Sequence, residues 1–300
     1  MEYVLTSSAL TKKYGKHKAL DGVDIKVPSG AVYGVIGKNG AGKTTLMRVL
    51  CDLQRADHGE YTLFGVSSED KSIQKQRKRV GALIERPALY ADMTAKENLT
   101  VQAAALGLSS FDAEALLKLV GLENAGRKRV RGFSLGMKQR LGIALALAGS
   151  PDLVFLDEPV NGLDPQGIVE IRELILKLNR EENITFVISS HILDELSKLA
   201  TDYCIMGGGR VVKQINAAEL ESSLQKCKEV TVTDTIALSV ALDKMGLSYE
   251  IKDEKNAKIY GDFKISELVN TLDCELLCIA ERDESLETYF LKMTGGDNNA

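Results

Sequence analysis

The sequence has no hydrophobic run long enough to cross a lipid bilayer. A membrane-spanning helix needs about 18 to 20 apolar residues in a row, whereas the best run here is the short stretch Leu141–Gly149. The first residues also lack the charged start, apolar middle and small-residue cleavage site of a secretion signal. We therefore expect a chain that does not insert into a membrane and that stays in the cytosol.

Cysteine is scarce and scattered. The five cysteines are odd in number and do not form the paired C-x-x-C spacing of a zinc knuckle, so a disulfide framework and a cysteine-based metal site are both disfavoured. We expect reduced thiols. Cys274 and Cys278 lie four apart in an apolar run typical of a strand, which predicts two buried thiols on one side of it.

Neither sign of charge dominates. The 38 Lys and Arg residues face 42 Asp and Glu residues, for a net charge of −4, which excludes a broad attraction to nucleic acid or to anionic lipid. The two basic runs, Lys75–Arg79 and Arg127–Arg131, are not interleaved with aromatic residues, and we interpret them as solvated faces. Any contact with a membrane must therefore be made through another protein.

The overall composition indicates a folded chain. Hydrophobic residues make up 44% and charged residues 27% of the 300 positions, which excludes disorder over most of the length. A chain of this length predicts two domains, one large and one small.

Short apolar runs alternate with helical patterns in the first two thirds of the chain. The runs Ala31–Ile36, Leu153–Leu156 and Ile184–Ser189 each end in glycine or polar residues, and a helical stretch, Lys43–Leu50, follows the first. This alternation predicts an α/β fold with a mainly parallel sheet, whose loops converge at the carboxyl ends of the strands. Residues 94–150 read as an inserted helical subdomain, with helices at Ala95–Leu106, Ala113–Val120 and Met137–Ala148.

The recognisable motifs end near Ala217, after a hairpin turn at Gly207–Gly209. We therefore predict a first domain at 1–217 and a small α+β domain at 218–300. The order of patterns in the second domain is strand, helix, strand, strand, helix, strand, which is ferredoxin-like. The predicted elements are Lys228–Thr233, Thr235–Met245, Ser248–Lys252, Lys258–Tyr260, Ile265–Leu272 and Glu275–Ala280, followed by a last helix, Glu284–Met293, and a mobile end, 295–300.

The strongest chemical signal is a glycine-rich segment between a predicted strand and a predicted helix. It matches the P-loop pattern G-x-x-x-x-G-K-[ST]. The glycines let the backbone wrap a phosphate chain, the helix N-terminus adds positive partial charge, and Lys43 neutralises phosphate charge. The Thr44 hydroxyl is a ligand for Mg²⁺, and Thr45 offers a further donor. The segment consists of Gly37, Lys38, Asn39, Gly40, Ala41, Gly42, Lys43 and Thr44.

Two carboxylates follow the buried run Leu153–Leu156. Asp157 can hold Mg²⁺ through water. Glu158 is then free to orient or deprotonate the water that attacks the γ-phosphate, which a P-loop alone cannot do.

At this point the chain resembles the nucleotide-binding subunit of an ABC transporter. Its segment Phe133–Met137 is similar to the family signature usually written L-S-G-G-Q, Asn161–Asp164 resembles the family's D-loop, and His191 resembles its switch histidine. The resemblance covers residues 3 to 216. It implies a P-loop ATPase that binds ATP and Mg²⁺ and hydrolyses ATP with Glu158 and His191 as catalytic residues.

The resemblance also implies that two chains sandwich two ATP molecules. Ser134, Leu135 and Gly136 then contact nucleotide held by the P-loop of the opposite subunit, because hydroxyl, amides and helix dipole form a second anion site. Asp164 lies at the dimer interface, and Tyr14 stacks on adenine. The dimer can be made of identical or different halves.

One position departs from the family pattern. Glu85, in the segment Val80–Pro87, stands where the family places a glutamine that approaches Mg²⁺. A glutamate there adds negative charge near the γ-phosphate unless magnesium compensates. With this glutamate and the segments Ser134–Gln139 and Asn161–Pro165, the chain is similar to the bacitracin-resistance and lantibiotic-immunity branch of exporters.

The resemblance implies an ATPase that drives a separate integral-membrane permease from the inner face of the cell membrane and exports a peptide antibiotic or related amphiphile. An ATPase that regulates a nucleic-acid or protein partner is the alternative, although the tandem ATPase units or long coiled coils usual in such relatives are absent from this sequence. The role of the second domain stays open between sensing, dimer support and packing, and we favour dimer support.

Overall fold

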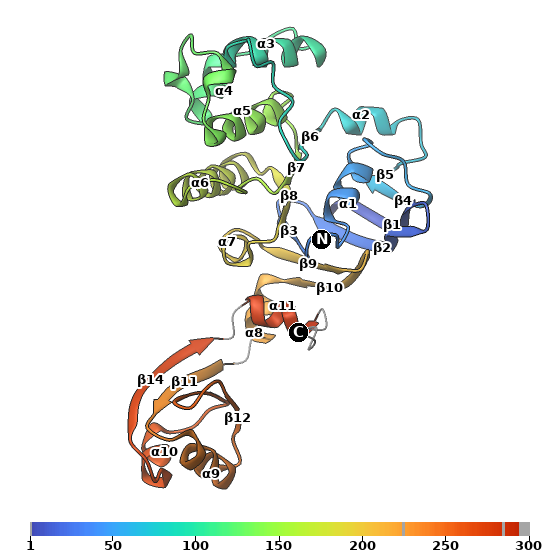
Figure 1. Cartoon of the computed structure of the whole chain (residues 1–300). Helices are drawn as coiled ribbons and strands as arrows, with labels where there is room; N and C mark the ends of the chain where they lie inside the picture. The colour runs from blue at the N-terminus through green and yellow to red at the C-terminus, as the bar shows by residue number, and fades with distance from the viewer. Residues whose placement is uncertain (1, 224–225, 284–285, 294–300) are drawn as a thin grey trace. The chain divides into compact units, whose positions relative to one another are not determined.

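The computed structural model describes residues 2–223, 226–283 and 286–293, and the chain divides into two units (Figure 1). The first unit comprises residues 1–217 and the second residues 218–300. The predicted start of the last helix at Glu284 and the predicted mobile end, 295–300, lie outside the described residues.

A six-stranded sheet forms the centre of the first unit, in the order β10-β9-β3-β8-β7-β6. All neighbours are parallel except β10 and β9. Every residue of β3, β7 and β8 is buried, which is why these strands read as continuous apolar runs. The predicted parallel sheet is confirmed. The strands are β3 (Val32–Ile36), β6 (Val80–Leu83), β7 (Leu153–Asp157), β8 (Thr185–Ser190), β9 (Asp202–Gly207) and β10 (Arg210–Asn216).

The register of this sheet brings three loops to one edge. Ile36 at the end of β3 pairs with Ser190, and Asp157 at the end of β7 pairs with Ser189. The chain segments that follow β3, β7 and β8 therefore leave the sheet side by side. They lead into the helices α1 (Lys43–Leu50), α6 (Pro165–Glu182) and α7 (Leu193–Ser197).

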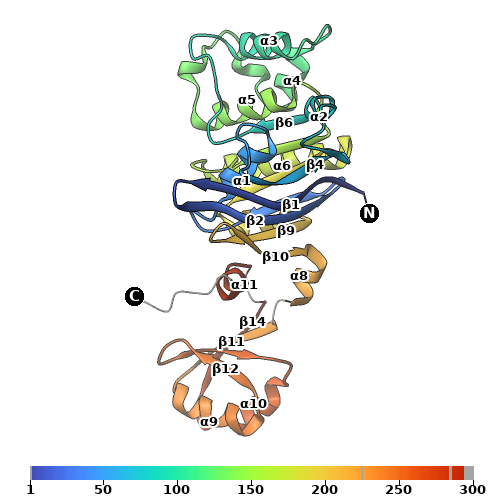
Figure 2. The same ribbon diagram turned by 90° about the vertical axis from the view of Figure 1, so that its right-hand side faces the viewer.

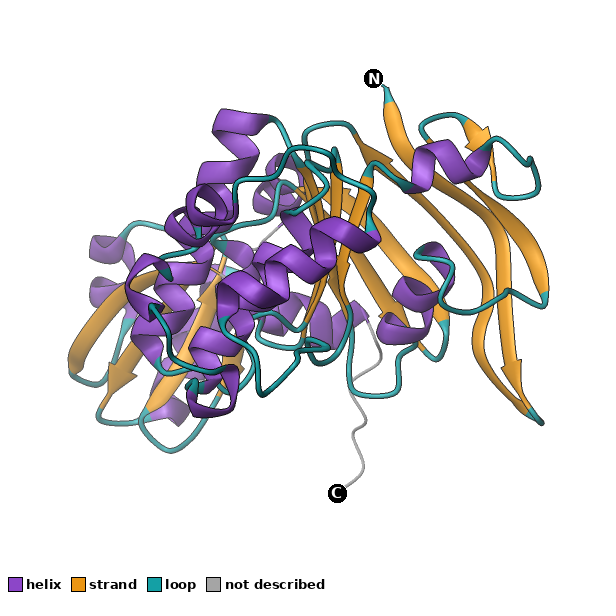
Figure 3. Cartoon of the chain, turned by 90° about the horizontal axis from the view of Figure 1, so that it is seen from above, coloured by secondary structure: helices purple, strands orange, loops and turns teal. Residues whose placement is uncertain are grey.

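A second, antiparallel sheet covers α1 on the side away from the parallel sheet (Figure 3). The sequence patterns above predict none of its strands. Its buried side chains, such as Leu5 and Ile25, share one core with Leu46 of α1 and Phe155 of β7, so α1 is held from both sides. The strands, in the order β2-β1-β4-β5, are β1 (Tyr3–Tyr14), β2 (His17–Pro28), β4 (His58–Leu63) and β5 (Val66–Ser67).

Three helices between β6 and β7 form the helical part of the first unit. Polar residues begin each one: Thr94 and Glu97 make a capping box, and Asp112 and Ser134 cap the next two helices. The third helix was predicted to start at Met137, but it begins at Leu135 because the Ser134 hydroxyl accepts the Met137 amide. The helices are α3 (Ala95–Ala105), α4 (Ala113–Leu119) and α5 (Leu135–Leu147), and the short α2 (Ile73–Arg77) precedes β6.

The second unit has its own core. Its antiparallel sheet has the order β12-β13-β11-β14, and α9 and α10 lie on one face of it (Figure 2). Leu238, Leu242 and Leu268 from these helices pack on Val230 and Ile259 from the strands. The elements are α8 (Ala217–Ser223), β11 (Lys226–Val232), α9 (Thr235–Met245), β12 (Ser248–Ile251), β13 (Asn256–Tyr260), α10 (Ile265–Thr271), β14 (Leu276–Asp283) and α11 (Leu286–Met293).

The prediction of two buried thiols in the second unit is wrong. Cys274 precedes β14 and is half-buried, and Cys278 is exposed. Ile279 packs against the core, so the neighbouring Cys278 points to the opposite face of the strand. In the first unit, burial raises the pKa of the Cys204 thiol to about 12, which keeps it protonated and unreactive.

Phe155 tests the core that supports the site. It is completely buried in β7, and Phe155→Ala should lower the free energy of unfolding of the first unit by about 3 to 5 kcal/mol. Leu53→Ala, at a position 65% exposed, should change it by less than about 0.5 kcal/mol. Denaturant unfolding of both variants measures the difference, and equal stability of the two would contradict this core.

Candidate functional site

The loop between β3 and α1 requires glycine at two positions. Gly40 and Gly42 have φ angles of 82° and 102°, in the region that residues with a side chain rarely adopt. A Cβ atom on Gly42 would also lie 2.5 Å from the backbone oxygen of Ala19. The chain can therefore turn tightly here and present its amides at the N-terminus of α1.

Lys43 lies inside this loop. Its side chain is buried, and its Nζ donates hydrogen bonds to the backbone oxygens of Gly37 at 2.7 Å and Lys38 at 3.5 Å. The same Nζ is 3.6 Å from a carboxylate oxygen of Glu158. A buried ammonium among carbonyl oxygens and glycine amides has the chemistry that holds a phosphate chain.

Asp157 joins the three loops at the sheet edge. This carboxylate is only 2% exposed. One oxygen accepts the Thr44 hydroxyl at 2.9 Å, and the other accepts the Ser189 hydroxyl at 2.5 Å. Thr44 lies in α1 after β3, Asp157 in β7 and Ser189 in β8. The Asp157 carboxylate therefore fixes the positions of these elements relative to one another. Ser189 was not predicted, although its place at the end of a buried strand beside Ser190-His191 was a usable signal.

The backbone conformation of Glu158 fixes the direction of its side chain. Its φ angle is 51°, and its amide donates to the oxygen of Ser189 at 3.2 Å and to the Ser189 hydroxyl at 3.0 Å. One carboxylate oxygen of Glu158 is 2.6 Å from Nδ1 of His191, while the other faces Lys43. The structure therefore brings the two predicted catalytic residues into direct contact.

Lys43, Glu158 and His191 line one cavity of about 470 Å³, which we call the P-loop cavity. Tyr14, at the end of β1, lies at its wall with 45% of its surface exposed, and its hydroxyl donates to Gln54 at 2.6 Å. The lining contains ten predicted residues, Tyr14, Asn39, Gly40, Ala41, Gly42, Lys43, Thr44, Thr45, Glu158 and His191, together with His17, Ala19 and Asn161.

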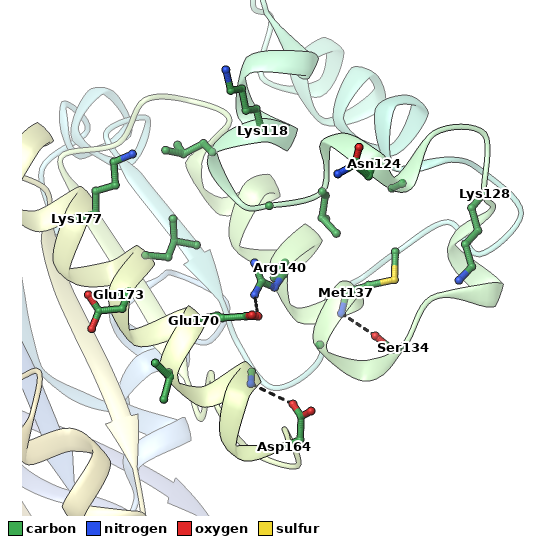
Figure 4. A pocket seen from close by; sticks show the side chains of 18 residues that line it. Lys118, Asn124, Lys128, Ser134, Met137, Arg140, Asp164, Glu170, Glu173 and Lys177 are labelled. Carbon is green, nitrogen blue, oxygen red and sulfur yellow. Dashed lines mark hydrogen bonds and ion pairs between the residues drawn. The ribbon is translucent and has the colours of Figure 1, made fainter.

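The signature residues lie at a different cavity, of about 930 Å³, between α5 and α6 (Figure 4). Ser134 is the N-cap of α5, and Gly136 lies in its first turn. Asp164 is the N-cap of α6, where it accepts the Gly167 amide at 3.1 Å. Leu135 is 53% exposed and lines a third cavity. The structure does not bring these four predicted residues into the P-loop cavity of their own chain.

An ion pair connects the two helices of the signature cavity. Arg140 of α5 pairs with Glu170 of α6 (Figure 4). Its Nη1 also donates to the backbone oxygen of Val120 at 2.9 Å. Arg140 therefore ties the signature helix to the end of α4 and to the helix that starts at Asp164. Neither residue was predicted.

Glu85 follows β6 in a loop, as predicted. Its φ angle is 62°, and its carboxylate accepts a hydrogen bond from Nη2 of Arg48 at 2.5 Å. Glu85 lines the third cavity, of about 790 Å³, together with Thr44, Asp157 and Glu158. It does not line the P-loop cavity, and Arg48 was not predicted.

Three features define a P-loop ATPase. They are a glycine-rich loop with a buried lysine after β3, a buried aspartate at the end of β7, and a glutamate in contact with a histidine. A family model described as ABC transporter matches residues 20–161. The chain is 38% identical to the bacitracin transport ATP-binding protein BcrA of Bacillus licheniformis over 99% of both chains. It is 43% identical to the lantibiotic transport ATP-binding protein SrtF of Streptococcus pyogenes over 68% of this chain and 86% of that protein.

The fold agrees with these sequence matches. The ADP conformation of MJ1267, an ATP-binding cassette of an ABC transporter, superposes with a TM-score of 0.66 at 25% identity, over 74% of this chain and 94% of that one. The chain therefore belongs to the family of ATP-binding, ATP-hydrolysing subunits of ABC transporters. Within the described residues, no helix has the length and apolar character needed to span a membrane.

Lys43→Ala tests the phosphate site. Removing the buried ammonium should weaken ATP binding at least about tenfold, because a hydrogen bond to a charged group contributes about 1.5 to 3 kcal/mol. Lys38→Ala removes an exposed lysine from the same loop and is the matched control. Titration calorimetry measures both, and equal ATP affinities would contradict the role of Lys43.

Proposed function

We propose that this chain works as a dimer that hydrolyses ATP to drive a separate integral-membrane permease, and that the transporter exports a peptide antibiotic or related amphiphile. The observation that carries the hydrolytic part is the placement of Glu158, 2.6 Å from His191 and 3.6 Å from Lys43 at the wall of the P-loop cavity.

The residues of this cavity divide the reaction between them. Lys43 and the loop amides bind the phosphates and stabilise charge as the terminal phosphoryl group is transferred. Glu158 holds the attacking water and takes its proton, while His191 fixes the Glu158 carboxylate and offers a ring nitrogen to the γ-phosphate. Tyr14 supplies a flat ring for the adenine.

The oxygen donors at the sheet edge fit Mg²⁺. The Thr44 hydroxyl and the Asp157 carboxylate converge within 2.9 Å, and hydroxyl and carboxylate oxygens are the ligands this ion prefers. Glu85, the third ligand that the sequence predicts, lines the third cavity, where its carboxylate is paired with Arg48. When bound with ATP, Mg²⁺ supplies positive charge that offsets the charge of the β- and γ-phosphates.

The separation of two anion sites supports the dimer. Ser134, Gly136 and the capped start of α6 at Asp164 line a cavity that contains no P-loop residue. Leu135, Ser134 and Gly136 can then contact ATP held by a second copy or by a related partner chain. ATP in such an assembly joins the two chains, and its hydrolysis releases them.

The similarity to BcrA supports the cargo class. That relative is a bacitracin transport ATP-binding protein and matches over 99% of both chains, the second unit included. A transport ATPase of this kind acts at the inner face of the cell membrane through its permease. The alternative, an ATPase that regulates a nucleic-acid or protein partner, is not favoured by relatives that carry transport names.

We also propose that the second unit is a ferredoxin-like domain that supports the dimer. Its strand-helix-strand-strand-helix-strand order and its antiparallel sheet with β11 and β13 in the centre support this assignment.

Glu158→Gln separates binding from hydrolysis. The amide keeps the size of the side chain but cannot take a proton, so ATP affinity should stay within about twofold while the hydrolysis rate falls about 100-fold or more. Glu182→Gln, at an exposed position at the end of α6, should leave both unchanged. Phosphate release and equilibrium titration measure the two properties, and a rate close to that of the unmodified chain would overturn the role of Glu158.

Deletion of residues 218–300 tests the second unit. The first unit has a separate core, so the shortened chain should bind ATP with unchanged affinity but dimerise more weakly or couple less well to transport. Sedimentation with Mg-ATP, together with transport by the reassembled permease complex, provides the measurement. Unchanged dimerisation and transport would reject this role.

A further inference from the structure

Three carboxylates line the third cavity, and each is held by different hydrogen-bond partners. Asp157 is held by the hydroxyls of Thr44 and Ser189, and Glu158 is held by His191. Glu85 is paired with Arg48, at 2.5 Å. Neither the P-loop motif nor the family resemblance accounts for the pair between Arg48 and Glu85.

The position of Arg48 links this pair to the nucleotide site. Arg48 lies in the last turn of α1, the helix that begins with Lys43. One helix thus carries both cations, Lys43 inside the P-loop and Arg48 on Glu85. The hydrogen bond that Arg48 donates to Glu85 raises the pKa of Arg48, with a smaller contribution from the Tyr14 hydroxyl, so Arg48 stays charged at any physiological pH.

A released Glu85 side chain would lie in a cavity next to the phosphate site. Thr44, Glu158 and Asn161 line both the P-loop cavity and the cavity of Glu85, so the two spaces share a wall. The carboxylate is 54% exposed and its backbone is fixed in a left-handed conformation beside this wall. A further negative charge turned toward the phosphates of ATP would repel them.

We propose that Arg48 is a positioning residue that holds the Glu85 carboxylate away from the phosphates of bound ATP. The ion pair with Arg48 thereby lets the chain carry a glutamate at position 85 without placing its negative charge beside ATP. A neutral side chain at this position would need no ion pair. The inference rests on the ATP-binding function of the P-loop cavity.

The expected effect is modest because both partners are partly exposed. The side chains of Arg48 and Glu85 are 38% and 54% exposed, and ion pairs of this kind are weak. Loss of Arg48 should therefore leave the fold intact and weaken ATP binding about threefold to fivefold at low salt. The loss should shrink near 1 M salt, where the screening length falls to about 3 Å.

The test is a cycle of variants in the full-length chain, measured by equilibrium titration with a non-hydrolysable ATP analogue and Mg²⁺. Arg48→Gln should show the threefold to fivefold loss of affinity, whereas Arg48→Lys should keep most of the affinity. In a Glu85→Gln background, Arg48→Gln should lower the affinity for the analogue less than about 1.5-fold, because no carboxylate remains to be released. Arg55→Gln, which removes an exposed arginine shortly after α1, is the matched control.

Two results would overturn the proposal. An equal loss of affinity with and without Glu85 would mean that Arg48 acts on ATP or on Tyr14 directly, and unchanged affinity in Arg48→Gln would mean that the pair has no role in binding. Failure of the unmodified chain to bind the analogue would instead contradict the ATP-binding function itself, so the two failures are distinguishable.

Discussion

The buried carboxylate of Asp157 is the constraint on which the rest of the site depends. A carboxylate that is 2% exposed is costly unless its oxygens are hydrogen-bonded. Thr44 and Ser189 satisfy one oxygen each, and they can do so only if β3, β7 and β8 end at the same level. The parallel register supplies that alignment. The same Ser189 hydroxyl also accepts the amide of Glu158. One hydrogen-bond network therefore fixes both the Thr44–Asp157 pair, which is proposed to hold Mg²⁺, and the direction of Glu158, the proposed hydrolytic residue.

The first unit carries two separate groups of predicted site residues, which we propose to be the two half-sites of an ATP-binding dimer. Lys43 and the proposed catalytic pair, Glu158 and His191, line the P-loop cavity, while Ser134, Gly136 and Asp164 line another cavity. Arg140 and Glu170 keep the two helices of that second half-site together. In the proposed dimer, a second chain completes the chemistry, and the association and separation of the two chains report the state of ATP to the permease.

Local motifs made most of the P-loop cavity predictable. Gly37 to Thr45, Glu158 and His191 each follow a buried strand, and parallel strands must bring their ends together. Asp157 ends one of these strands. The antiparallel sheet was missed because its first strand is irregular: Ala9 has a φ angle of 49°, and the pairing with β2 shifts between Ser7 and Leu10, which breaks the period-two pattern. Arg48 and Glu85 lie 37 residues apart, so no local pattern connects them. The contacts of Ser189 and Arg140 likewise arise only from tertiary packing.

The most direct test of this account is sedimentation of purified Glu158→Gln with and without Mg-ATP. Because the two half-sites need each other and the variant cannot cleave the nucleotide, the account predicts a monomer without ATP and a stable dimer with it. A chain that remains monomeric at saturating Mg-ATP would contradict a self-sufficient ATP-closed dimer, and with it the roles assigned to Ser134 and Glu158.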